Sequence, residues 1–266
     1  MKTSTQRAID VASSDLVAAF QRDGAVCLRG LLDAGDLTTL RRGIDANLAA
    51  PSPRAIVASQ PDDPGYFIED FCNWQDNADY RALILQSPLA EAAALLMASR
   101  SVRLYHDHML TKEPGTRQPT PWHQDQPYYN IDGQQNVSFW IPVDPVPLAS
   151  TLRFVAGSHA GTWYMPRTFR DQQAKWFPEG TLAELPPIDA EPQAYRQLAW
   201  ALEPGDCVAF HMLSLHASSG TGPGAPAGPS VTVTDEGETL VQYRSTDNAG
   251  NTSAWTPASA TAGSTA

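Results

Sequence analysis

The sequence has little cysteine, no long apolar run and fewer basic than acidic residues. Its three cysteines, Cys27, Cys72 and Cys207, are too few and too scattered for a disulfide framework or a zinc knuckle, so we expect buried, reduced thiols. No segment approaches the ~18 consecutive apolar residues of a membrane span, and the first residues lack the apolar core of a signal peptide. We therefore expect a soluble, cytoplasmic protein without a membrane partner.

The charge balance excludes another class of partner. The 266 residues contain 29 Asp and Glu against 18 Lys and Arg, a formal net charge of −11. The hydrophobic content of 42% is ordinary for a globular fold and allows a sizeable core. Proteins that bind nucleic acid usually carry a basic face or stripe, so we expect no nucleic-acid partner.

Helical signals are concentrated in the first hundred residues. Segments 13–23, 33–50 and 87–99 place apolar residues at helical spacing after a Ser or Asp. From about residue 101, short β-like runs such as "VSFWIPVDPV" and "DCVAFHMLSLHAS" are separated by Pro and Gly. This pattern predicts a mainly β fold with flanking helices, either a sandwich or a jelly-roll barrel. Residues 165–200 have little periodicity and are expected to form a long insertion that covers a site.

The clearest boundary in the chain lies near Gly220. We expect residues 1–220 to form one domain, followed by the linker-like "GTGPGAPAGPS". In the remaining segment, residues 221–266, "VTVTDEGETLVQYRST" predicts a β-hairpin, and a low-complexity tail follows it. So short a segment is too small to form a sandwich by itself.

The segment "PTPWHQDQPYYN", residues 119–130, contains a possible metal-ligand pair. Side chains two apart on a strand share a face, so His123 and Asp125 are expected to project together. His216, on a β-like segment roughly ninety residues later, is the candidate third ligand, with His211 as its rival. Two imidazoles and a carboxylate on one face leave three adjacent positions open, the arrangement of non-haem Fe(II) oxygenases. A cupin-like metal hydrolase or isomerase with the same triad is an alternative.

Several segments resemble the phytanoyl-CoA dioxygenase family, among them "KEPGTRQPTPWHQDQPYYN", "TLRFVAGSHAGTWYMP" and "LEPGDCVAFHMLSLHASSG". The resemblance covers about residues 12–220 and implies a double-stranded β-helix core of the jelly-roll, cupin-like type. It also implies Fe(II)- and 2-oxoglutarate-dependent hydroxylation of a small molecule with O2, releasing succinate and CO2. The implied iron ligands and catalytic residues are His123, Asp125 and His216. Related halogenases lack that carboxylate, so Asp125 favours hydroxylation.

The resemblance implies a binding pocket for 2-oxoglutarate as well. The residues at matching or neighbouring positions are His108, Trp140, Ser218 and Lys112. The family places an arginine about eleven residues after the second histidine, where it pairs with the far carboxylate of 2-oxoglutarate. That position is Ala227 here, and Arg244 is the late candidate to replace the arginine. The alternative interpretation is a catalytically impaired metal-binding homologue whose C-terminus lacks this arginine.

The remaining histidines and aromatic residues have ordinary interpretations. We expect His106 to line the cavity or to be hydrogen-bonded in the core, and His159 to bond a turn. Tyr128 and Tyr129 are expected to pack beside the ligand strand, where one of them can contact substrate. The tail "VTVTDEGETLVQYRSTDNAGNTSAW" is similar to the end of an immunoglobulin-like repeat of bacterial surface proteins, so we expect the last barrel strand of the family to be replaced.

Overall fold

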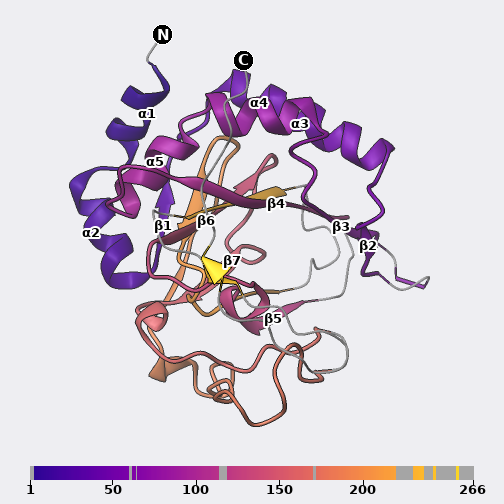
Figure 1. Cartoon of the computed structure of the whole chain (residues 1–266), viewed down its shortest axis with the longest axis vertical. Helices are drawn as coiled ribbons and strands as arrows, with labels where there is room; N and C mark the ends of the chain where they lie inside the picture. The colour runs from indigo at the N-terminus through magenta and orange to yellow at the C-terminus, as the bar shows by residue number, and fades with distance from the viewer. Residues whose placement is uncertain are drawn as a thin grey trace.

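Helices occupy much of the first hundred residues, in agreement with the apolar spacing. The computed structural model describes residues 3–59, 62–63, 65–113, 119–169, 172–219, 230–236, 242–243 and 256–257. The helices in these ranges are α1 (Ser4–Val11), α2 (Ser14–Asp23), α3 (Ala34–Ala49), α4 (Ala78–Gln86) and α5 (Leu89–Leu96). They gather on one side of the strands, at the top and left of Figure 1.

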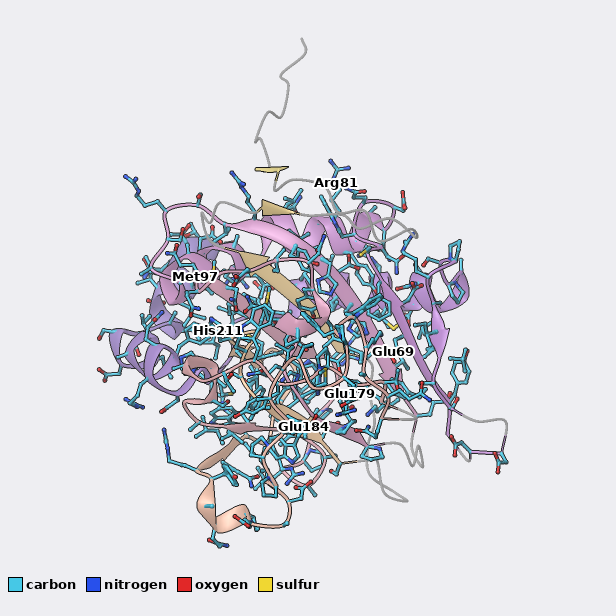
Figure 2. The ribbon with its side chains drawn as sticks, turned by 60° about the horizontal axis from the view of Figure 1, so that its bottom comes forward. Glu69, Arg81, Met97, Glu179, Glu184 and His211 are labelled. Carbon is cyan, nitrogen blue, oxygen red and sulfur yellow. The ribbon has the colours of Figure 1, made fainter. Side chains whose placement is uncertain are left out.

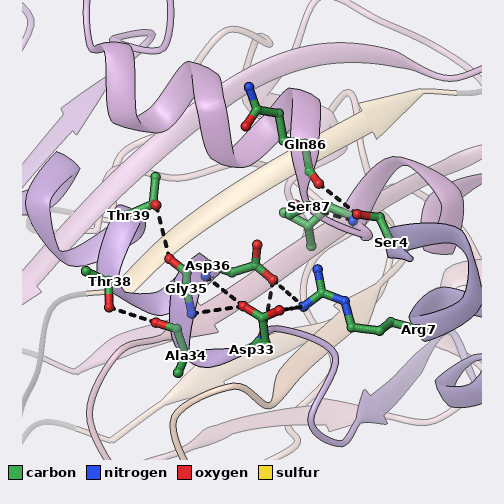
Figure 3. Close-up of polar contacts among 11 residues, drawn as sticks. Ser4, Arg7, Asp33, Ala34, Gly35, Asp36, Thr38, Thr39, Gln86 and Ser87 are labelled. Atoms are coloured by element: carbon green, nitrogen blue, oxygen red, sulfur yellow. Dashed lines mark hydrogen bonds and ion pairs between the residues drawn. The ribbon is translucent and has the colours of Figure 1, made fainter. Parts of the chain in front are cut away.

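Local signals begin and end these helices. Ser13 caps α2 by accepting a backbone N–H, and the helix ends at Gly24, whose φ of +78° is a left-handed conformation that glycine adopts without strain. Asp33 and Asp36 form a capping box at the start of α3. The guanidinium of Arg7, on α1, lies 2.5 Å and 2.7 Å from these two carboxylates and so ties α1 to α3 (Figure 3).

The two main sheets of the described residues are antiparallel, and the predicted jelly-roll fold is confirmed. The larger sheet has the order β1 (Ala25–Leu28), β9 (Cys207–Phe210), β6 (Asn136–Pro142), β11 (Ser230–Glu236), β4 (Arg103–Lys112), β3 (Phe67–Phe71) and β2 (Ile56–Val57). The smaller sheet has the order β5 (Thr120–His123), β10 (His216–Ser218), β7 (Leu152–Val155) and β8 (Gln197–Ala199).

Strand alternation divides the larger sheet into two faces. Phe139 of β6 and Met109 of β4 are fully buried in the core shared with the helices. On β4 the residues that alternate with Met109 must face the other way, toward the smaller sheet. These inward residues are His106, His108, Leu110 and Lys112. The sheet therefore turns the β4 histidines and lysine toward the space between the two sheets.

The smaller sheet is covered on both sides. Between the sheets, Phe154 of β7 packs with Phe210 of β9, and Trp140 of β6 contacts the same cluster. The outer face presents Trp122, Val155 and neighbouring apolar residues. Side chains that follow β7 cover this face, namely Tyr164, Leu185, Ile188 and Tyr195. The long insertion predicted over residues 165–200 thus packs against the outside of the smaller sheet, at the bottom of Figure 1.

The C-terminal segment contributes a strand to the larger sheet. Each residue of β11 pairs with β6 on one edge and with β4 on the other. The predicted hairpin pairing of this strand is therefore wrong, because both of its edges are occupied. Farther along, β12 (Gln242–Tyr243) pairs instead with β13 (Thr256–Pro257). The division of the chain into residues 1–220 and 221–266 stays a prediction.

The cysteines differ from expectation at one position. Cys27 and Cys207 are buried free thiols, but Cys72 is exposed directly after β3, with a positive φ of 57°. β3 ends at Phe71, and the left-handed backbone of Cys72 interrupts the alternation of side chains there. No helix in the described part of the chain is long and apolar enough to cross a membrane.

Candidate metal centre

Two distant segments bring the predicted ligands together. His216, the first residue of β10, is paired directly with His123, the last residue of β5. Asp125 is not on the strand: β5 ends at His123, and Asp125 precedes a 3-10 turn over Gln126–Tyr128. The structure therefore corrects the reason given for the pair, since a turn rather than strand alternation directs the carboxylate toward the histidines.

The three side chains converge closely enough to bind one ion. One ligand atom from each of His123, Asp125 and His216 lies within 4.8 Å of the others. Oδ1 of Asp125 is 3.4 Å from Nε2 of His123 and 3.6 Å from Nε2 of His216. The alternative ligand His211 has both ring nitrogens engaged elsewhere: Nε2 lies 3.0 Å from the carbonyl of Gln134, and Nδ1 accepts the N–H of Leu213.

Hydrogen bonds fix the orientation and the tautomer of both ligand imidazoles. Nδ1 of His123 lies 2.8 Å from the carbonyl oxygen of Pro121, and Nδ1 of His216 lies 2.9 Å from that of Ser214. A carbonyl oxygen only accepts, so each Nδ1 carries the proton and each Nε2 presents a lone pair. This arrangement orients metal-binding histidines in general. The donor set thus fits a divalent transition metal.

The protonation states of His216 and Asp125 also favour metal binding. Burial lowers the pKa of His216 to about 4, and the neighbouring His123 acts in the same direction. For Asp125, burial acts to raise the pKa, but the adjacent His216 and His123 outweigh it and hold the pKa below its usual value. Neutral imidazoles and an ionised carboxylate are the forms that bind metal ions.

Gln124, between the first two ligands, holds the ligand turn in place. It is only 2% exposed; its Nε2 donates to the carbonyls of Leu213 (2.9 Å) and Thr162 (3.1 Å), and its Oε1 accepts the N–H of Tyr164 (2.9 Å). The sequence places Gln124 opposite the ligands but contains no signal for these partners. They lie on loops 38 to 89 residues away.

Aromatic rings surround the histidines. The rings of Phe154 and Phe210 lie 5.7 Å and 4.9 Å from the ring of His216. On the insertion side, Phe169 lies 4.8 Å from His123 and 6.0 Å from Tyr128. Phe169 was not among the predicted site residues, since nothing local indicates which part of an insertion reaches the site.

An open cleft lies between the ligand strand and the insertion. Its lining includes His123, Gln124, Tyr128, Arg167 and Phe169. Arg167 is anchored by two carboxylates of the insertion, Glu179 at 2.6 Å and Glu184 at 2.7 Å. Figure 2 shows these two glutamates close together at the front of the molecule.

The residues predicted for 2-oxoglutarate lie on the two facing sheets. His108 stacks on Phe71 and its Nε2 lies 3.0 Å from Oε2 of Glu69. Trp140 belongs to the core between the sheets. Ser218 shares a strand face with His216 and is paired with Thr120, whose hydroxyl accepts a hydrogen bond of 3.1 Å from Lys112. Arg244 lies outside the described residues.

His106 and His159 lie outside the metal triad. His106 is buried beside the Tyr129 ring at 5.0 Å, and burial lowers its pKa to about 4. His159 lies in a 3-10 turn, Ser158–Ala160, with Nε2 at 3.2 Å from the carbonyl of Gln21.

Two facing antiparallel sheets with a His-Asp-His cluster between them define a cupin-like, double-stranded β-helix protein. The model of the phytanoyl-CoA dioxygenase (PhyH) family matches residues 20–224. The chain therefore belongs to this family, as the sequence resemblance indicates. Among curated proteins, no sequence matches this chain.

Solved structures share the fold at low sequence identity. The α-ketoglutarate-dependent carbocyclase SnoK of nogalamycin biosynthesis is 18% identical, with a TM-score of 0.69 over 91% of this chain and 88% of its own. The epimerase SnoN, in complex with Fe3+, α-ketoglutarate and nogalamycin RO, is 21% identical, with a TM-score of 0.66 over 87% and 85% of the two chains. EctD from S. alaskensis with bound Fe is 16% identical, with a TM-score of 0.66 over 85% and 76%.

Proposed function

We propose that this protein is an Fe(II)- and 2-oxoglutarate-dependent oxygenase that hydroxylates a small molecule. The observation that carries the proposal is the convergence of His123, Asp125 and His216 between the two sheets, with both Nε2 atoms facing the same carboxylate. Membership of the family supports it. So do the Fe3+ and α-ketoglutarate bound in the similarly folded SnoN. When bound, iron with 2-oxoglutarate and O2 supplies the oxidising power for C–H hydroxylation, with succinate and CO2 as co-products.

Different residues of the chain would hold the metal and line the cosubstrate pocket. The triad would hold the metal through two neutral imidazoles and one carboxylate, which leaves one face open for ligands. Inward side chains of the two sheets, His108, Trp140, Ser218 and Lys112, would line the cosubstrate pocket. Arg244 is a further candidate from the tail.

The substrate side of the proposed site is the aromatic cleft next to the ligand strand. Phe169 and Tyr128 border it and lie against His123. Apolar rings exclude water around a reacting centre and strengthen its electrostatic interactions. A small molecule with an apolar or aromatic surface fits this lining.

Substrate-free turnover tests the proposal. The protein, supplied with Fe(II), ascorbate, 2-oxoglutarate and O2, is expected to form succinate slowly, and His123→Ala is expected to form none above background. Metal content measured on both proteins serves as the second readout, with less metal expected in the variant. Equal succinate from both proteins, or none from either while metal content is also equal, would contradict the proposal.

A second candidate is a metal-binding homologue that does not bind 2-oxoglutarate. It is favoured by the absence of any Arg or Lys in the sequence between His216 and Arg244, where the family has its arginine. Anaerobic calorimetry of the Mn(II)-loaded protein with 2-oxoglutarate separates the two functions. Micromolar binding excludes the second candidate, and absence of binding to metal-loaded protein excludes the first.

A further inference from the structure

Lys112 lies inside the barrel, at the far end of the ligand strand from the metal ligands. It is the last residue of β4, on the face that points toward the smaller sheet. Its Nζ donates a hydrogen bond of 3.1 Å to the hydroxyl of Thr120, the first residue of β5. Thr120 is paired with Ser218, which lies two residues after His216. An ammonium and a hydroxyl thus meet where the two sheets face each other, and Ser218 lies opposite that hydroxyl-bearing residue in the strand register.

Lys112 is largely buried and still cationic. Its Nζ also lies 4.7 Å above the ring of Phe67. Burial lowers the pKa of Lys112 to about 8, while Glu69 acts in the opposite direction. The ammonium form therefore still dominates at neutral pH. Because a desolvated cation gains more from an anion than a hydrated one does, this end of the barrel suits a carboxylate.

The length of the strand matches the length of a small dicarboxylate. Thr120 precedes His123 by three residues on β5, but across a register shift the two residues pair with Ser218 and His216, which are two residues apart on β10, so the span is about 7–10 Å at ~3.3 Å per residue. The end carbons of a five-carbon chain lie about 5 Å apart. A metal–oxygen bond of about 2 Å at one end and a hydrogen bond of about 2.8 Å at the other add most of the remaining distance.

We propose that Lys112, together with Thr120 and Ser218, binds the distal carboxylate of 2-oxoglutarate in this chain. The proposal rests on the proposed function and assigns to a β4 lysine the task that the family gives to an arginine on a later strand. Lysine offers a point charge with three donors rather than a planar fork. The hydroxyls of Thr120 and Ser218 supply the directional hydrogen bonds that a lysine alone does not.

A pair of ligands isolates this interaction. 2-Oxopentanoate has the same chain length and the same chelating end as 2-oxoglutarate but lacks the distal carboxylate. Binding of each acid is measured anaerobically by calorimetry with Mn(II) and by the charge-transfer absorption of the Fe(II) complex. Neither readout depends on turnover. The proteins compared are wild type, Lys112→Met, Lys112→Arg and Arg81→Met.

Lys112→Met is expected to weaken 2-oxoglutarate binding about 10- to 100-fold, the range for loss of a hydrogen bond to a charged group. Its affinity for 2-oxopentanoate should stay within about twofold of wild type, because this acid lacks the one group of the ligand that Lys112 contacts in the proposal. Lys112→Arg is expected to recover part of the loss for 2-oxoglutarate. Arg81, exposed on α4 at the top of Figure 2, is the matched control for removing one positive charge, and Arg81→Met should bind both acids as wild type does.

The outcomes distinguish this inference from the function on which it rests. If wild type and Lys112→Met bind 2-oxoglutarate equally, or if the variant loses both acids equally while still binding Mn(II), the inference is overturned and the proposed function stands. If metal-loaded wild type binds neither acid, both are overturned. Thr120→Val offers a second variant that leaves the charge in place, and a loss confined to 2-oxoglutarate supports the inference.

Discussion

Replacing Gln124 with leucine tests how the metal centre is held in place. Leucine fills a similar volume but removes the side-chain groups that bond Leu213, Thr162 and Tyr164. These bonds join the turn between His123 and Asp125 to the loop before β10 and to the insertion. The backbone N–H of Asp125 donates to Met212 at 2.9 Å, so the same loop already holds the aspartate.

The three lost hydrogen bonds differ in cost because they differ in burial. The bond to Leu213 is buried, whereas those to Thr162 and Tyr164 are partly buried and can be replaced in part by water. We take about 2 kcal/mol for the first and about 1 kcal/mol for each of the others, within the range for unsatisfied buried groups. The free energy of unfolding should therefore fall by about 4 kcal/mol, a large share of the total stability of a typical domain. Metal affinity should fall ~10- to 100-fold, as for other groups that orient metal ligands.

Urea unfolding of the metal-free protein and a Mn(II) titration measure the two effects. Gln135→Leu is the matched control, because it removes one partly buried hydrogen bond, of 3.0 Å to the carbonyl of Met97, away from the ligand turn. It should cost no more than about 1 kcal/mol and leave Mn(II) affinity unchanged. If Gln124→Leu unfolds like this control and binds Mn(II) as wild type does, Gln124 does not position the ligands.

Two further predictions concern the metal ligands and the acid stability of the fold. His216→Ala should abolish measurable Mn(II) binding at micromolar protein, whereas His211→Ala should retain it in the same titration; the reverse result would reassign the ligand. Burial acts to raise the pKa of Asp70, but hydrogen bonds from Ser52 and nearby asparagines outweigh it and lower the pKa to about 2. The folded-state pKa is depressed, so Asp70 contributes its stability above pH ~4 and loses it as the pH falls toward 2. Asp70→Asn should thus cost ~1–2 kcal/mol at pH 7, and in urea unfolding its difference from wild type should shrink below pH 4; a constant difference would contradict this.

Local sequence signals account for the parts of the fold that depend on near neighbours. Apolar spacing and the Ser13 and Gly24 caps predict α2 almost residue for residue, because capping involves contacts within one helical turn. The inward direction of His108 on β4 follows in the same way from strand alternation. The local pattern does not predict non-local pairing. It predicts a hairpin for the segment that contains β11, whereas β11 pairs with β4 on one edge and with β6 on the other.

The sequence by itself determined which residues could bind a metal and in what order they occur: His123 and Asp125 in one motif, and His216 on a later strand. Only the tertiary structure decided that they meet. The register of β10 against β5 places His216 opposite His123. A turn directs Asp125 toward both histidines, and hydrogen bonds from Gln124 and to the carbonyl of Met212 hold this turn. It also decided that Lys112 of one sheet faces Thr120 of the other. Such contacts depend on how the two sheets pack against each other over a common core. The periodicity of a single segment does not determine that packing.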